Sequence, residues 1–180
     1  ATPQRMEFSD FALEFLEWYQ TQNSAKSYRD YKNLFTSTII PHFKSFILND
    51  ITARHIEQYK QKRKAVIQEG TVNKELTALK HLFNKAIQWN LIKENPLKHV
   101  KKLRIKQKKF RFLSLAEISL VLAHSEGIVR AILMTAIHTG MRKSELFRLE
   151  WNDVNFEAGY IEVSNKEDEH TKNYQNREIP

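Results

Sequence analysis

The sequence has no cysteine and little glycine or proline. Only 4 glycines and 4 prolines occur among 180 residues, which argues against an all-β fold with many tight turns. Without cysteine there are no disulfides and no thiolate metal sites, which fits a reducing cytosol. We find no run of 18 apolar residues and no charged-then-apolar leader, so we expect neither a membrane span nor a secretory signal. The 7 histidines are scattered without metal-binding spacing, and we expect no metal site.

Positive charge is concentrated in one short segment of the chain. The formal net charge is +8, and residues 91–111 alone hold 9 Lys/Arg and 1 acidic residue. Residues 1–90 carry a net charge of +4, and residues 112–180 a net charge of −4. Clustered basic residues are typical of a protein that binds a polyanion such as nucleic acid. A solvated linker enriched in lysine would have the same composition.

Apolar residues recur with the period of an α-helix through the first 90 residues. The pattern predicts four helices with short connections, over residues 7–20, 25–40, 52–68 and 71–87. We expect Pro41 to end the second helix and Gly70 to stop the third. Thr52 and Thr71 are good N-caps for the third and fourth. Residues 1–97 are therefore interpreted as one helical domain.

A second domain is predicted over residues 112–180. Ser114 and Glu117 have the spacing of a capping box, and the apolar segment 128–138 predicts a buried helix. Alternation in residues 160–163 predicts a strand, and residues 178–180 the end of a returning strand. Between the two domains, residues 98–111 contain 8 Lys/Arg and no acid, and we interpret them as an interdomain linker.

One stretch of the second domain combines a glycine turn with an arginine and a glutamate. Residues 138–146 read HTGMRKSEL. The guanidinium of Arg142 can hold two phosphate oxygens at once and never loses its charge. Glu145 lies three residues later, on the same helical face, where it could brace that guanidinium. A surface ion pair on a short helix would have the same spacing.

The order TGxRxxEL, followed by LxWxDV, resembles the first catalytic box of the tyrosine recombinases of the phage-integrase family. Residues 70–80 resemble the core-binding domain of that family, and residues 112–118 the usual start of its catalytic domain. The resemblance covers almost the whole chain. It implies a mainly α fold: a four-helix SAM-like core-binding domain, followed by a truncated α+β catalytic domain with a β-hairpin.

The resemblance also implies roles for individual residues. Arg142 would bind the scissile phosphate, Glu145 matches the family's acidic position, and Lys172 would protonate the departing 5′-oxygen from the hairpin, with Lys166 as its rival. No metal or nucleotide cofactor is implied, because a 3′-phosphotyrosine bond conserves the energy of the cut strand. Tyr174 lies too early to be the nucleophile. We therefore expect the complete protein to be an enzyme and this chain alone not to cleave DNA.

Several residues are expected to contact DNA. Asn73, Thr77, Lys80 and Asn84 are spaced to share one outward face of the fourth predicted helix, although an ordinary solvated face would show the same pattern. With the resemblance, the expected contacts are Lys26, Arg29, Thr71, Asn73, Lys74, Thr77, Lys80, Lys101, Lys102, Lys108 and Lys109.

The implied partner is double-stranded DNA, with a tetramer of the complete protein on DNA, in the bacterial cytoplasm and not at a membrane. Two hypotheses remain open. The chain is part of a site-specific recombinase, or it is a catalytically inactive DNA-binding or regulatory module on the same scaffold. A helical protein-interaction domain with a basic tail is a third reading, which gives no account of Arg142 or Lys172.

Overall fold

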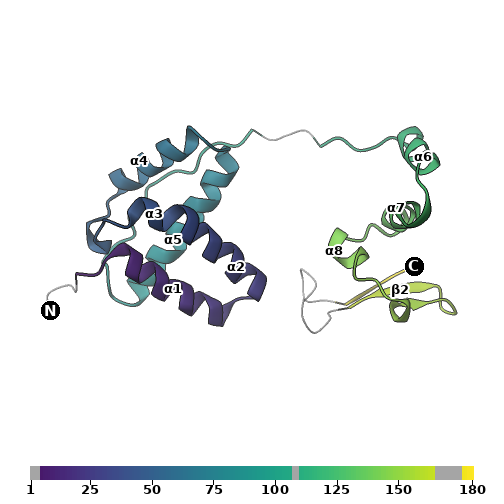
Figure 1. The fold of residues 1–180 in the computed structure, drawn as a ribbon, viewed down its shortest axis with the longest axis horizontal. Helices are drawn as coiled ribbons and strands as arrows, with labels where there is room; N and C mark the ends of the chain where they lie inside the picture. The colour runs from purple at the N-terminus through teal and green to yellow at the C-terminus, as the bar shows by residue number, and fades with distance from the viewer. Residues whose placement is uncertain (1–4, 107–109, 165–175) are drawn as a thin grey trace. The chain divides into compact units, whose positions relative to one another are not determined.

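The chain forms two compact units, Ala1–Lys108 and Lys109–Pro180 (Figure 1). A computed structural model describes residues 5–106, 110–164 and 176–180. Each unit is described by itself.

The first unit is helical. Its elements are α1 (Phe8–Gln22), α2 (Ala25–Leu34), the π-helical turn η1 (Phe35–Ile39), α3 (Ile40–Phe43), the 3-10 turn η2 (Leu48–Asp50), α4 (Ala53–Lys64) and α5 (Glu69–Gln88). Because α2, η1 and α3 follow one another without a break, the unit has the four helical segments that apolar periodicity predicts. The predicted mainly α fold is confirmed.

The prediction that Pro41 ends the second helix is wrong. The helical run continues through Pro41 to Phe43. The amide of Ile40 donates to the carbonyl of Phe35, five residues back, so the chain makes a wider turn just before the proline. Proline has no amide hydrogen, and its ring clashes with the carbonyl four residues earlier in a regular α-helix. The π-helical turn accommodates both features.

The predicted boundary at Gly70 is also wrong. Helix α4 ends earlier, at Lys64, and α5 begins at Glu69, so Gly70 and Thr71 lie inside the first turn of α5. A Cβ atom at Gly70 would lie 3.9 Å from Ile105 Cδ1, an ordinary van der Waals distance. Thr52 does cap α4, and its amide donates to His55 Nδ1 at 3.2 Å.

The core of the first unit is rich in aromatic side chains. Seven of its fully buried side chains are aromatic: Phe8, Phe11, Phe15, Phe35, Phe43, Phe83 and Tyr59. Apolar side chains of α5 join them: Val72, Leu76, Leu79, Leu82 and Ala86. Each fully buried Leu or Phe side chain contributes about 1.5–3 kcal/mol relative to an exposed one. This burial fixes α5 in the unit, with its other face in solvent.

The second unit places helices before a small sheet. Its elements are α6 (Leu115–Ala123), α7 (Gly127–Thr139), α8 (Lys143–Leu146), the 3-10 turn η3 (Trp151–Asp153), β1 (Val154–Asn155), β2 (Tyr160–Val163) and β3 (Arg177–Ile179). The antiparallel sheet has the order β1-β2-β3, and Val163 lies opposite Arg177. The predicted β-hairpin is therefore confirmed, as is the capping box of α6, in which the Ser114 amide donates to Glu117 Oε2 at 2.8 Å.

Helix α7 forms where predicted, but it is not buried. Ile128 is 73% exposed and Val129 55%. Among the described residues of the second unit, the only buried hydrophobic side chains are Met141 and Val163. An apolar helix with no second layer over it leaves its side chains in solvent. No described helix is both long enough and apolar enough to span a membrane.

Candidate active site and DNA interface

A glycine turn delivers Arg142 to the start of α8. Helix α7 ends at Thr139 and is followed by Gly140, whose φ of 61° lies in the left-handed region that glycine adopts at little cost. The chain then turns through the buried Met141 to Arg142, the residue that precedes α8. The Arg142 amide donates to Glu145 Oε2 at 2.8 Å, which closes the first turn of α8.

The Glu145 carboxylate is shared by two arginines. Arg142 Nη1 lies 2.9 Å from Oε1. From strand β3, Arg177 donates through Nη1 to Oε1 at 3.1 Å and through Nη2 to Oε2 at 2.6 Å. The hydrogen bonds from Arg177 and then from Arg142 lower the pKa of Glu145 to about 2, although burial raises it. Glu145 is therefore ionised at neutral pH and joins α8 to the hairpin.

The charges at this site do not cancel. Among the described residues that contact Glu145, two guanidinium groups meet one carboxylate, an excess of one positive charge. The Glu145 side chain is only 8% exposed, whereas the Arg142 side chain is 47% exposed and Arg177 37%. Arginine has five N–H donors, and Glu145 uses one from the Arg142 side chain. The other donors of Arg142 belong to a side chain that is about half exposed, and they suit an anion with several oxygens, such as a phosphate.

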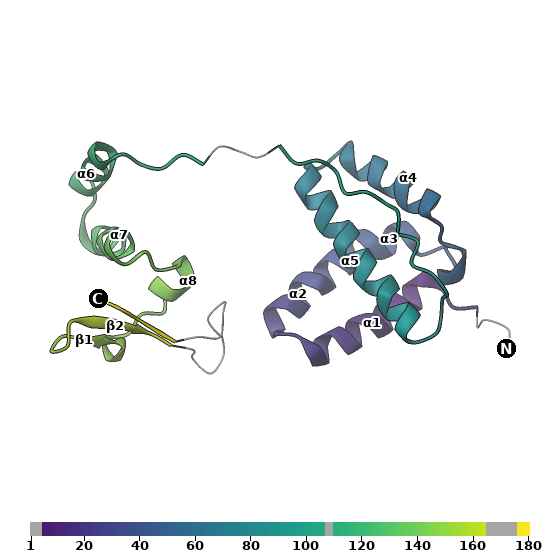
Figure 2. The ribbon, with the colours of Figure 1, turned by 180° about the vertical axis from the view of Figure 1, so that it is seen from behind.

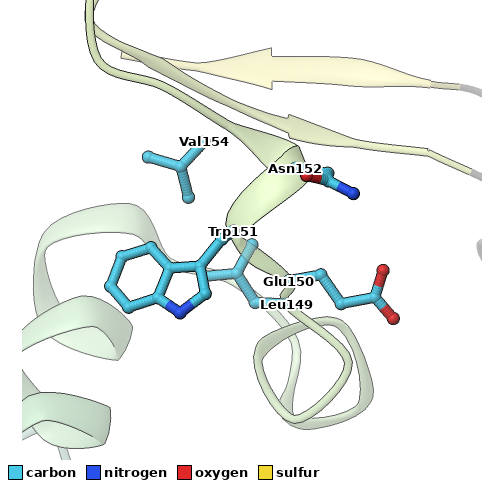
Figure 3. Close-up of a pocket in the computed structure, with 5 residues that line it drawn as sticks. All are labelled: Leu149, Glu150, Trp151, Asn152 and Val154. Atoms are coloured by element: carbon cyan, nitrogen blue, oxygen red, sulfur yellow. The ribbon is translucent and has the colours of Figure 1, made fainter.

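The second unit also has a pocket of about 640 Å³, and the residues that line it follow α8 in the sequence. Leu149, Glu150, Trp151, Asn152 and Val154 line it (Figure 3). The Trp151 ring is largely exposed and stacks on Phe156, with ring centroids 6.3 Å apart. None of these lining residues is basic, so the pocket does not suit a phosphate as the arginine site does.

The outer face of α5 carries four of the predicted DNA contacts. Thr71, Lys74, Thr77 and Lys80 are all exposed on it, and Lys26 and Arg29 are exposed on α2. The prediction that Asn73 shares this outward face is wrong. Asn73 is buried, because both ends of its carboxamide bind the main chain of Leu103, 30 residues later.

The first part of the basic segment lies on the first unit. Lys60 Nζ donates to the carbonyl of Lys101 at 3.1 Å, and Val100 and Leu103 pack against the core. Lys101 and Lys102 are exposed, as predicted. The described part of the segment expected to be a linker is thus held in place by side chains of α4 and α5.

Comparison with known proteins agrees with these two units. The family model of the phage integrase N-terminal SAM-like domain matches residues 7–64, and that of the phage integrase family matches residues 111–180. This chain belongs to the phage-integrase family of tyrosine recombinases.

Relatives of this integrase-family chain include the ICEBs1 integrase of Bacillus subtilis, 28% identical over 135 residues, which are 71% of this chain and 36% of the relative. The shufflon-specific DNA recombinase of Escherichia coli is 26% identical over 163 residues, 83% of this chain and 41% of the relative. The chain thus spans about two fifths of the length of these curated relatives. A lambda integrase tetramer bound to a Holliday junction matches with a TM-score of 0.84 at 18% identity, over 98% of this chain and 49% of that one. At this identity the likeness is one of fold.

The structure brings some of the predicted site residues of this chain together and leaves others undescribed. Arg142 and Glu145 are in direct contact. Lys172, its rival Lys166, Tyr174, Lys108 and Lys109 lie outside the described residues. No group of three His, Cys, Asp or Glu side chains that could hold a metal occurs in the part of the chain that the structure describes.

Sequence reasoning missed Arg177. Arg177 belongs to residues 171–180, which resemble the family's β-hairpin, and it is the basic residue before the Ile179-Pro180 ending. Its contact with Glu145 depends on the pairing of β2 with β3, which places Arg177 opposite Val163. The sequence thus marked Arg177 as part of the hairpin, but it did not indicate that Glu145 is its partner.

Proposed function

We propose that this chain is the DNA-binding and phosphate-binding portion of a site-specific recombinase. The complete protein would cut and rejoin duplex DNA through a 3′-phosphotyrosine intermediate. One observation carries the proposal: a half-exposed Arg142 is held by a buried carboxylate that also binds a second arginine. A rigid guanidinium with free donors suits the charge that develops on a phosphate in the transition state.

Each residue of the site has a distinct proposed role. Arg142 binds the scissile phosphate, and Glu145 positions Arg142. Lys172 of the hairpin protonates the 5′-oxygen that leaves, with Lys166 as the alternative donor. The arginines supply the positive charge that a metal would otherwise provide, so the proposed mechanism uses no metal and no cofactor.

The proposed partner is double-stranded DNA. The exposed row of Thr71, Lys74, Thr77 and Lys80 on α5 supports it, because small polar side chains and lysines suit a helix placed against a duplex. Integrase structures with the same fold include a tetramer on a Holliday junction. We propose the same assembly for the complete protein, acting in the bacterial cytoplasm.

On its own, this chain is proposed to bind DNA without cutting it. Tyr59 donates to the buried Glu75, and Tyr19 and Tyr31 stack on each other with ring centroids 4.2 Å apart. These tyrosines serve the core. Tyr174 lies outside the described residues and comes too early to match the nucleophile of the family.

The test begins with the coding sequence beyond the codon for Pro180. The longer protein is incubated with nicked duplex DNA that carries its recombination site, and covalent protein–DNA complexes are measured on denaturing gels. We expect a covalent band from the longer protein and none from the 180-residue chain. Binding without any covalent band would favour the inactive DNA-binding module instead.

In that longer protein, Arg142→Ala is expected to lower the cleavage rate by about 10²-fold or more, while the DNA dissociation constant changes little. Arg142→Lys is the matched variant, because it keeps the charge and loses the planar pair of donors. Cleavage at the wild-type rate by Arg142→Ala would refute the phosphate-binding role. Lys172→Ala and Lys166→Ala, compared in the same assay, decide between the two lysines.

A further inference from the structure

The segment from Asn95 onwards, which carries the basic residues, runs back along α5 in the direction opposite to the helix (Figure 2). Its contacts follow that order. Asn95 Nδ2 donates to the carbonyl of Lys80 at 3.1 Å, Leu103 contacts Asn73, and Ile105 lies next to Gly70. As the segment advances, its partners move towards the start of α5. The segment therefore follows the helix surface up to residue 105.

The side chain of Asn73 binds this segment at a single residue, Leu103. Its Nδ2 donates to the Leu103 carbonyl at 2.9 Å, and its Oδ1 accepts from the Leu103 amide at 2.8 Å. The side chain thus satisfies both main-chain groups of Leu103, as a neighbouring strand would. Asn73 is 8% exposed, so these two bonds are shielded from water. The planar carboxamide of asparagine carries a donor and an acceptor side by side on a short side chain, and glutamine carries the same group one methylene farther out.

This attachment sorts the side chains of the segment into two sets. Val100 and Leu103 pack against the core. The four basic side chains of residues 101–106 are exposed instead: Lys101, Lys102, Arg104 and Lys106. None of these four makes an ion pair with a carboxylate among the described residues. Four like charges are thus held close together on a fixed support.

We propose that Asn73 is a positioning residue for DNA binding, which holds Lys101, Lys102, Arg104 and Lys106 as a preformed row that contacts DNA phosphates. This inference rests on the proposed DNA-binding function and deepens it. The row has long cationic side chains, which are common contacts to the phosphate backbone of DNA. A segment that is ordered before binding loses less conformational entropy on the duplex than a free tether does.

The proposal makes separate predictions for the affinity of the chain for DNA and for the salt dependence of that affinity. Neutralising cations of the row removes phosphate contacts, and each lost contact reduces the slope of log K against log salt by about 0.9. Releasing the row from Asn73 leaves the number of cations unchanged. We therefore expect a loss of affinity with an unchanged salt slope.

The test uses the 180-residue chain and a fluorescent duplex of about 20 base pairs, titrated at several salt concentrations between about 50 and 300 mM. Asn73→Ala should weaken binding by about 3- to 10-fold at unchanged slope, within the range expected for ordering a few side chains. Leu103→Pro removes the amide from the other partner and leaves α5 intact, so it should have the same effect. Asn23→Ala is the matched control, because Asn23 Nδ2 donates to the carbonyl of Tyr19 in α1 and does not contact the basic row. The double variant Lys102→Gln/Arg104→Gln should reduce the slope by about two.

Hydrogen exchange of residues 98–106 reports the attachment directly and should become faster in Asn73→Ala. Faster exchange with unchanged affinity in both Asn73→Ala and Leu103→Pro would overturn the positioning role. An unchanged slope in the double variant would show that the row does not contact phosphates. In both cases the wild-type chain still binds the duplex, and the proposed function stands. Failure of the wild-type chain to bind any duplex would instead count against the proposed function.

Discussion

Both units of the chain bury a glutamate that is bonded to arginine, and the surroundings of the two glutamates differ. In the first unit Glu75 is 1% exposed and accepts from Tyr59 at 2.8 Å and from Arg63 Nη2 at 2.7 Å. Its partners come from α4, so the network joins α4 to α5. In the second unit Glu145 binds two arginines, of which Arg142 turns half of its side chain to solvent.

The comparison separates a stabilising ion pair from one that prepares a binding group. At Glu75 the hydroxyl of Tyr59 is fully inside the core and takes up one carboxylate oxygen. At Glu145 the carboxylate restrains Arg142, while most of the donors of that arginine stay available for another anion. A glutamate–arginine pair thus stabilises the packing of one unit and, in our proposal, prepares phosphate binding in the other.

The largest effect is expected from Glu75→Ala. The change leaves the buried hydroxyl of Tyr59 without its acceptor and Arg63 without its carboxylate, and breaking such a pair costs about 3 kcal/mol or more. Urea unfolding followed through Trp18 and Trp89, both in the aromatic part of the first unit, measures the loss. Glu57→Ala removes the exposed partner of Lys60 and should cost less than about 1 kcal/mol. Equal losses in the two variants would contradict the contrast between buried and exposed pairs.

A smaller effect is expected at Glu145, and it should depend on pH. Because the folded-state pKa of Glu145 lies near 2, below its ordinary value, its ion pairs stabilise the second unit above about pH 4.5 and are lost as the pH falls towards 2. Glu145→Gln should cost about 1–2 kcal/mol at neutral pH and remove that share of the acid sensitivity. Hydrogen exchange of α8 and β3, corrected for the intrinsic pH dependence of exchange, measures both.

Glu162→Gln is the matched control for this pH dependence. Glu162 is exposed on β2 and lies opposite Glu178, so its neutralisation relieves a repulsion between like charges. The control should be neutral or slightly stabilising and should leave the acid transition of α8 in place. An acid transition that Glu145→Gln does not alter would show that other carboxylates govern this unit.

Local sequence patterns correctly predicted structural features that depend only on residues close together in the sequence. Apolar periodicity located the helices, the Ser114–Glu117 spacing predicted a real capping box, and the Arg142–Glu145 spacing predicted a real contact. Pro41 was misjudged because a local π-helical turn accommodates it, and such a turn leaves no periodic signal.

The features that were missed depend on residues far apart in the sequence. Asn73 fits an outward stripe on a helical wheel, yet Leu103, 30 residues away, covers it. Arg177 reaches Glu145 across 32 residues and only because the hairpin has its particular register. The apolar content of α7 correctly indicated a helix, but it could not show what, if anything, packs over that helix.

The smallest effect is expected for Tyr59 in the first unit, and it should depend on pH in the alkaline range. Burial, followed by the bond to Glu75, raises the pKa of Tyr59 above its ordinary value of 10. Its stabilising contribution is therefore complete below about pH 10 and is lost as the pH rises further, because the unfolded tyrosine ionises first. Tyr59→Phe should cost about 1 kcal/mol at neutral pH, the usual net value of one hydrogen bond. In urea unfolding the difference in unfolding free energy between the variant and the wild type should shrink above about pH 10, since only the wild type has this proton to lose.

Tyr28→Phe is the control, because Tyr28 is only partly buried at the edge of the core. A difference that stays constant across this pH range would mean that Tyr59 titrates no differently in the folded chain than in the unfolded one.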